Sequence, residues 1–116
     1  MREGDIIKMP IPQQDKKVTA RPVLLIKKFP GQSDWLVAGI SSKLHKEIKG
    51  FDFLITNKHQ DYKSSGLIYP GLIRLNFLAV IPENEIEGSI GSISTTTHRK
   101  IIQTLKRFLS GKLNAK

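Results

Sequence analysis

The sequence of 116 residues has no cysteine, no long apolar run and only 7% aromatic residues. The absence of cysteine excludes disulfides, thiolate nucleophiles and cysteine-ligated zinc, and it is compatible with a reducing compartment. No apolar run approaches the roughly 18 residues of a membrane span, and the opening segment Met1–Asp5 lacks the apolar stretch of a secretory signal. These absences lead us to expect a cytoplasmic protein that does not contact a membrane.

Positive charge is in excess throughout the chain. The 19 Lys and Arg residues against 10 Asp and Glu residues give a net charge of +9. Residues 1–40, 41–80 and 81–116 each carry +3, so the excess is not confined to a tail. A basic body attracts polyanions, and phosphate contacts supply most sequence-independent affinity for nucleic acid. The same charge would also attract an acidic protein partner. The alternative is that the excess of lysine serves only solubility.

The length and the hydrophobic fraction of 39% indicate one globular domain over residues 1–116. Short apolar segments separated by proline and glycine turns favour strands, most of them adjacent to the next along the chain. Pro10 and Pro12 are expected to close the first strand, and a polar loop is expected over residues 12–20. The expected strands are Asp5–Met9, Val23–Ile26, Trp35–Ile40 and Leu72–Ile81, with an edge strand within Leu44–Gly50 and a short apolar segment at Phe51–Ile55.

One amphipathic helix is expected near the C-terminus, at about residues 95–110. Ser94 is its expected N-cap and Gly111 its C′ residue. Thr56 to Ser65 is polar and is expected to be a loop or one helical turn. Apolar side chains recur at the spacing of one helix face, namely His98, Ile101, Ile102, Leu105, Phe108 and Leu109. The pattern therefore predicts a mainly β, small, partly open barrel with a C-terminal helix packed on it.

No metal site and no cofactor are expected. The three histidines His45, His59 and His98 are scattered, without the spacing of a helical metal site. His98 lies on the apolar side of the expected helix and is interpreted as a half-buried structural residue, whereas the other two lie in polar segments. Gly88–Gly91 lacks the residues of a phosphate-binding loop, so we do not expect chemistry on a nucleoside triphosphate.

Arg21 is the first candidate for a functional side chain. Pro22 holds its backbone extended, so the guanidinium projects from a rigid point and suits a phosphate ligand. If the second and third strands form a hairpin about Gly31, Ser41 lies as far beyond the turn as Arg21 lies before it. A hydroxyl and a guanidinium together position and neutralise a phosphoryl group. An ion pair at a strand start for Arg21, and a turn at Ser41 and Ser42, are the alternatives.

The expected strand at Leu72–Ile81 supplies a second pair of candidate functional residues. Strand alternation places Arg74 and Asn76 on one face and Ile73, Leu75 and Phe77 on the other. Aromatic side chains for stacking bases are few, and the loop residues Tyr62 and Tyr69 are the platforms that the sequence suggests.

Several segments together resemble the MazF/PemK/Kid family of toxin endoribonucleases from bacterial toxin–antitoxin systems. Their order and spacing cover nearly the whole chain, although no single segment is specific. The segments are Gly4–Ile7, Arg21–Ile26 after a variable polar loop, Ala38–Ser42, Gly66-Leu67 before a strand bearing Arg74, and Ile90–Ser94 before a C-terminal helix.

This resemblance implies an SH3-like barrel of the CcdB type that dimerises and cleaves single-stranded RNA without a metal. It also implies a small acidic antitoxin that covers the RNA groove, and contact with operator DNA only together with that antitoxin. Arg21 matches the family's catalytic arginine, Ser41 lies where many members have a catalytic threonine, and Arg74 matches an arginine that acts as general acid or phosphate ligand. The residues expected to contact nucleic acid are Lys17, Thr19, Ser42, Asn76 and Tyr69.

Two departures from the family pattern leave alternatives open. Asn76 stands where the Kid-like branch has an aspartate, and an amide does not accept a proton as a carboxylate does. The polar loop before Arg21 also lacks the histidine that some members use. The alternatives are a catalytically degenerate barrel that only binds nucleic acid or protein, and a CcdB-like gyrase poison on the same fold.

Overall fold

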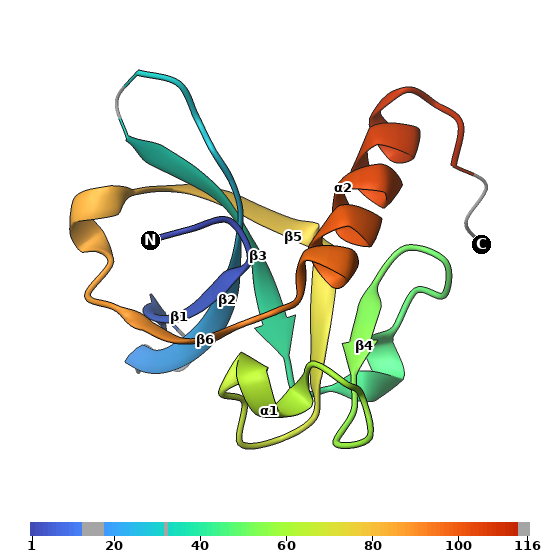
Figure 1. Ribbon diagram of the computed structural model, residues 1–116, viewed down its shortest axis with the longest axis horizontal. Coiled ribbons are helices and arrows are strands. Elements are labelled where there is room, and N and C mark those ends of the chain that lie inside the picture. Colours follow the sequence, from blue (N-terminus) through green and yellow to red (C-terminus); the bar gives the residue numbers. More distant parts are fainter. Residues whose placement is uncertain (13–17, 32, 114–116) are drawn as a thin grey trace.

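The computed structural model describes residues 1–12, 18–31 and 33–113 and forms a six-stranded antiparallel sheet curled into a half-barrel (Figure 1). Each strand pairs antiparallel with its neighbours. Across the sheet the strands are β4 (Phe53–Ile55), β5 (Gly71–Pro82), β3 (Asp34–Ser41), β2 (Val18–Lys28), β1 (Asp5–Pro12) and β6 (Ser89–Ser92). The expected mainly β, partly open barrel is therefore confirmed.

The long helix α2 (Thr95–Leu109) follows β6 and lies against the sheet (Figure 1). The side chain of Ser94 accepts a hydrogen bond from the backbone N–H of Thr97 and caps the helix, and Gly111 follows it with a φ of +74°. One helical turn, α1 (Tyr62–Ser65), precedes β5, and two 3₁₀ turns occupy η1 (Leu44–Lys46) and η2 (Glu83–Glu85). No helix in the described part of the chain is long and apolar enough to cross a membrane.

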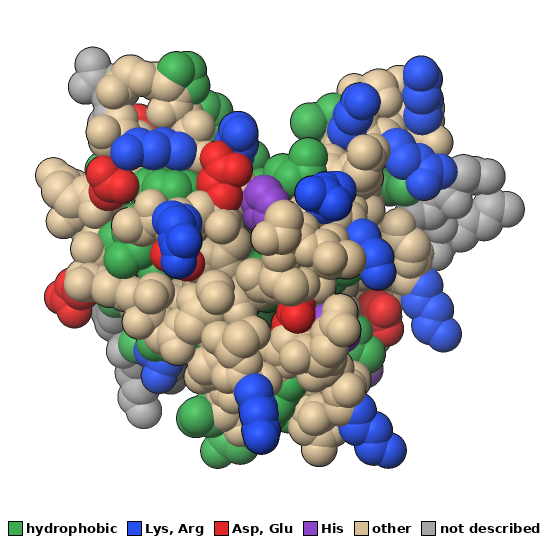
Figure 2. Space-filling view, in the orientation of Figure 1, with side chains coloured by type: hydrophobic (Ala, Val, Ile, Leu, Met, Phe, Trp, Pro, Cys, Tyr) green, Lys and Arg blue, Asp and Glu red, His purple; other side chains and the backbone are tan. Residues whose placement is uncertain are grey.

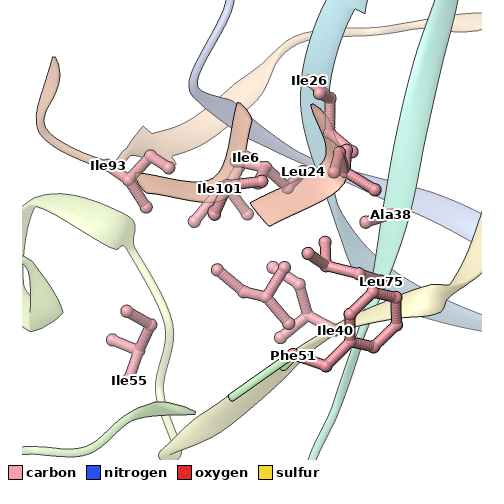
Figure 3. Packing of buried hydrophobic residues seen from close by; sticks show 12 residues of the cluster. Ile6, Leu24, Ile26, Ala38, Ile40, Phe51, Ile55, Leu75, Ile93 and Ile101 are labelled. Atoms are coloured by element: carbon pink, nitrogen blue, oxygen red, sulfur yellow. The ribbon is translucent and has the colours of Figure 1, made fainter. Parts of the chain in front are cut away.

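The sheet buries apolar side chains on both faces because successive strand residues alternate. The larger cluster includes Leu24, Ile26 and Ala38 and packs against Ile101 of α2 (Figure 3). A smaller cluster on the opposite face consists of Ile7, Val23, Leu25, Trp35 and Val37. Each fully buried aliphatic side chain contributes about 1.5–3 kcal/mol, so both faces hold the central strands in register.

Two expectations for the first hairpin are wrong. β1 continues through Pro10 to Pro12, and β2 already begins at Val18, so the ends of the expected loop 12–20 are strand. β6 pairs only with the residues from Asp5 to Ile7, so the later part of β1 has a hydrogen-bonding neighbour on one side only. Proline fits such an edge because it has no N–H to donate, and no neighbouring strand on that side needs one. Residues 13–17 of the expected loop lie outside the described residues.

The expected edge strand within Leu44–Gly50 is also wrong. Leu44–Lys46 is a 3₁₀ turn, and the strand forms later, at β4. The buried carboxylate of Asp52 explains the difference because its Oδ2 accepts a hydrogen bond from the N–H of Ile48 at 2.9 Å. This local hydrogen bond folds the chain back and takes the place of the backbone hydrogen bonds that an extended strand would form with a neighbour.

The alternation expected along β5 fails after Leu75. Gly39 pairs with Arg74, whereas the preceding residue Ala38 pairs with Leu78, so the β5 segment from Leu75 to Phe77 is inserted as a bulge. The Oδ1 atom of Asp52 accepts a hydrogen bond from the N–H of Leu75 at 3.1 Å, where the bulge begins. Leu75 is buried in the larger core, but Phe77 is 52% exposed and does not join it.

A second buried carboxylate, Asp61, joins α1 to the start of α2. Its Oδ2 accepts hydrogen bonds from the backbone N–H of Ser94 at 3.1 Å and from the Ser94 hydroxyl at 3.0 Å. Burial acts to raise the pKa of Asp61, but hydrogen bonds from Thr97 and Ser94 and the nearby His59 outweigh it, so the pKa is lowered from its ordinary value. The ionised carboxylate is therefore part of the folded state.

Replacing Asp61 with Asn is expected to lower the free energy of unfolding at pH 7 by about 1–3 kcal/mol because a charge-assisted interaction is lost. A lowered folded-state pKa stabilises the protein above the unfolded pKa, and this stabilisation is lost as the pH falls through the folded value. Urea unfolding should thus show a smaller difference in the free energy of unfolding between wild type and variant at pH 3 than at pH 7. An equal difference at both pH values would contradict this account, and Glu87→Gln on an exposed turn is the control.

Candidate nucleic-acid interface

The hairpin of β2 and β3 brings Arg21 and Ser41 to the same end of the sheet. The register pairs Val23 with Gly39, and continuing it by two residues sets Arg21 opposite Ser41, which agrees with the expected symmetry about Gly31. Because the two residues share a position across neighbouring strands, their side chains extend from the same face and edge.

A pocket of about 280 Å³ opens where these strands end against the loop between α1 and β5. Arg21 and Ser41 both line it, together with Lys8 from β1, Ser42 and Tyr69. Two of these lining residues are cationic and none of the described ones is acidic. The pocket is therefore a positively charged hollow with hydroxyl donors, which suits a phosphate group.

Close backbone packing holds the α1–β5 loop over the strand ends. Gly66 has a φ of +74°, and a Cβ atom built on it would overlap the carbonyl oxygen of Ile90. A Cβ on Gly91 would likewise overlap the backbone of Ser65. Glycine is required at both points, and the resulting fit presents Tyr69, 68% exposed, at the pocket mouth.

Arg74 lies near the pocket but does not line it. It pairs with Gly39, so it extends from the sheet face that carries Val23 and, two residues earlier in β2, Arg21. Its Nε atom is buried without a hydrogen-bond partner among residues 1–12, 18–31 and 33–113. An unsatisfied buried donor costs about 1–3 kcal/mol, and such costs persist mainly where function requires the group.

The remaining candidates are distributed unevenly. Asn76 is exposed within the β5 bulge, so it does not continue the alternation from Arg74 and lies outside the pocket. The backbone of Thr19 pairs with Ile11, but its side chain and the whole of Lys17 lie outside the described residues. The structure therefore brings four candidates around one pocket, namely Arg21, Ser41, Ser42 and Tyr69.

The histidines make structural contacts. The ring Nε2 of His98 lies 2.7 Å from the carbonyl oxygen of Ile26, which is the half-buried structural position expected from the sequence. His59 Nδ1 accepts a hydrogen bond from the N–H of Asp61, so this half-buried ring also has a structural contact. His45 is exposed in η1. The described residues contain no group of three or more metal-ligating side chains.

Sequence reasoning missed Phe77 and chose Tyr62 in error. Tyr62 is half-buried and packs against the larger core, so its ring is not a free platform. The exposed ring of Phe77 lies against Gly39, because a Cβ on that glycine would come within 2.5 Å of Phe77 Cδ2. Gly39 itself was the available signal, since a glycine inside a strand marks a close approach of another group.

Positive charge also gathers on the α2 side of the molecule. In the view of Figure 2, Lys and Arg side chains surround the molecule, and the lobe formed by α2 carries cations without acidic side chains. The segment 88–116 contains six Lys or Arg residues and no Asp or Glu. The basic surface is thus larger than one phosphate site.

Residues 2–109 match the family model described as PemK-like, MazF-like toxin of type II toxin–antitoxin system. No curated protein matches the sequence significantly. An endoribonuclease in complex with its cognate antitoxin from mycobacterial species has a similar structure, with a TM-score of 0.65 and 12% identity over 93% of each chain. The Mycobacterium tuberculosis toxin MazF-mt6 has a TM-score of 0.60 and 19% identity, covering 89% of this chain and 96% of that chain. At these identities the likeness shows a shared fold.

Replacing Arg74 with Met is expected to leave the free energy of unfolding unchanged or to raise it by about 1 kcal/mol, because the unsatisfied Nε donor is removed while the side-chain stem is kept. Chemical unfolding of the two proteins measures the difference. Leu75→Ala, at the neighbouring buried position, is the contrasting variant and should lose about 2–5 kcal/mol. A loss of more than about 1 kcal/mol in Arg74→Met would show that the guanidinium stabilises the fold.

Proposed function

The chain belongs to the PemK-like, MazF-like toxin family of type II toxin–antitoxin systems, and on that premise we propose that it is an endoribonuclease that cleaves single-stranded RNA without a metal ion. Family members are endoribonucleases, and cleavage of mRNA in the cytoplasm would inhibit growth. The observation that carries the proposal is the meeting of Arg21 and Ser41 at one basic pocket, with Arg74 on the same sheet face.

RNA contains its own nucleophile. In the proposed reaction the 2′-oxygen forms a bond to the adjacent phosphorus and the bond from phosphorus to the 5′-oxygen breaks, so no activated water is needed. The proton of the 2′-hydroxyl is removed and the 5′-oxygen gains one. The charge that develops on the phosphoryl oxygens is what the protein must stabilise.

Arg21 and Arg74 are proposed to neutralise the phosphoryl oxygens, and the Ser41 hydroxyl to donate a further hydrogen bond. Pro22 fixes the backbone after Arg21, so little reorganisation is needed when the charge develops. Neither a carboxylate nor an imidazole is among the described residues that line the pocket. The proposal therefore assigns charge stabilisation and orientation to these side chains, and it assigns no residue as the general base.

An acidic antitoxin is the proposed protein partner. The basic pocket around Lys8 and Arg21 and the acid-free segment 88–116 offer it a complementary surface. An acidic chain that occupied the pocket would exclude RNA phosphates from the same cations. In this proposal the complex, rather than the free toxin, contacts operator DNA.

A homodimer is proposed from the exposed apolar side chains beyond the core. Leu78 and Val80 of β5 are 38% and 56% exposed, and Leu109 of α2 is 77% exposed. Figure 2 shows a notch between the β2–β3 hairpin and the α2 lobe, with hydrophobic side chains on its walls. Contiguous exposed apolar surface on a small protein is typical of an interface.

The purified protein is expected to cleave single-stranded RNA in the presence of a chelator. Arg21→Ala should lower kcat by about 10²–10³ because one preorganised charged donor is lost. Ser41→Ala removes one neutral hydrogen bond and should lower kcat by about fivefold. Lys100→Ala, which removes one exposed charge on α2, is the matched control and should cleave as the wild type does.

Two outcomes would replace this proposal. Salt-dependent RNA binding with intact RNA recovered would indicate the catalytically degenerate barrel. Inhibition of DNA supercoiling without RNA cleavage would indicate the gyrase poison. Cleavage that is unchanged in Arg21→Ala would remove this pocket from the mechanism.

Replacing Val80 with Glu is expected to convert a dimer to a monomer, because a charge cannot be buried in an apolar interface without a partner. Sedimentation velocity measures the oligomeric state. Asn57→Glu in the exposed turn before α1 is the control and should leave the dimer intact. A wild type that sediments as a monomer at micromolar concentration would contradict the dimer.

A further inference from the structure

Phe77 presents an aromatic ring in the middle of the sheet face that carries the candidate phosphate ligands. The ring is 52% exposed, although the residue lies inside the longest strand. Its position follows from the bulge in β5, which turns Phe77 away from the core that buries Leu75. Whether the ring contacts a ligand therefore depends on what surrounds it.

Gly39 fixes where the ring lies. A Cβ atom at this position would come within 2.5 Å of Cδ2 and 3.0 Å of Cε2 of Phe77, so the ring packs directly on bare backbone. In β3, Gly39 continues the face of Trp35 and Val37, both of which belong to the smaller core. One side of the ring is thus supported by the sheet, and the half-exposed remainder is accessible.

Two arginines lie on the same sheet face, in the two strands that flank β3. Arg74 pairs directly with Gly39, and Arg21 lies one strand over and two residues along, about 8 Å from Gly39 by strand spacing and rise. Long arginine side chains span such a distance. A supported aromatic ring on a sheet face that also carries two arginines is the combination that binds single-stranded nucleic acid, with bases on the ring and phosphates on the cations.

We infer that Phe77 is the platform on which an unpaired base of the RNA stacks, next to the phosphate held by Arg21 and Arg74. This inference rests on the proposed function and adds a residue to its substrate site. Stacking on an aromatic ring tolerates every base, so Phe77 contributes affinity and positioning rather than a choice among bases. It holds the nucleotide while the arginines hold the phosphate, which orients the 2′-hydroxyl.

Binding of a fully 2′-O-methylated single-stranded oligonucleotide tests the platform separately from cleavage, because this probe has no free 2′-hydroxyl. Phe77→Leu in the full chain should bind it roughly tenfold to a hundredfold more weakly, whereas Phe77→Trp should bind at least as well as wild type. Phe29→Leu is the matched control, since Phe29 is a comparably exposed ring at the far end of the hairpin. It should bind within twofold of wild type.

An abasic version of the same probe separates stacking from a general disturbance of the site. Wild type and Phe77→Leu should bind the abasic strand equally, because no base remains to stack. Both should also keep the same salt dependence, whereas Arg21→Ala should lose about 0.7 of its slope of log K against log salt, because one phosphate contact to a single strand is removed. Thermal unfolding of each variant shows that it is folded.

The inference is overturned if Phe77→Leu binds the base-containing probe as wild type does, or if its loss is equally large on the abasic strand. It is also overturned if Phe77→Leu changes the oligomeric state while RNA binding stays unchanged, which would make the ring a protein contact. Failure of the wild type to cleave RNA, with the Phe77 effect on binding intact, would refute the endoribonuclease and leave the platform standing.

Discussion

The register change between β3 and β5 controls which side chains share a face of this sheet. Side chains in a strand alternate, so an insertion between Arg74 and Leu78 reverses the alternation for the rest of β5. Before the insertion, β5 places Arg74 beside Gly39 on the face of the smaller core. Beyond it, Leu78 lies opposite Ala38, on the face of the larger core. One strand thereby supplies both a candidate phosphate ligand and the apolar surface proposed for dimerisation.

Buried carboxylates hold the irregular parts of this arrangement in place. Asp52 bonds to the N–H of Leu75 at the start of the bulge and to the N–H of Ile48 in the segment before β4. Asp61 fixes α1 against the first turn of α2 through Ser94. Each satisfies backbone donors that a bulge or helix start would otherwise leave unpaired. The α1–β5 loop then packs over the strand ends, where Arg21 and Ser41 meet.

In the proposed function, phosphate binding and stability make opposite demands on Arg74. Its buried Nε has no partner in the described part of the chain, which is a cost to the folded protein. Arg74 pairs with Gly39, on which the exposed ring of Phe77 packs, and this combination is suited to a ligand that supplies both a phosphate and a base. The same cations would attract an acidic antitoxin, so substrate and inhibitor would compete for one surface.

The sequence by itself determined most of the strands and the capped C-terminal helix, because apolar patterning, caps and turn residues act within a few positions of one another. The family came from a resemblance of several segments, which the family model matches over residues 2–109. It also predicted the pairing of Arg21 with Ser41, since a hairpin fixes register by counting from its turn. It did not predict that β1 extends through its prolines, that residues 44–46 form a 3₁₀ turn, or that Phe77 leaves the core face. Those outcomes depend on a missing neighbour at a sheet edge, on the buried Asp52, and on a glycine in another strand that receives an aromatic ring. The sheet edge and the contact of Phe77 with Gly39 depend on segments distant in sequence, so only the tertiary structure decides them. The hydrogen bond from Ile48 to Asp52 spans only four residues, but Asp52 is buried only once the chain has folded.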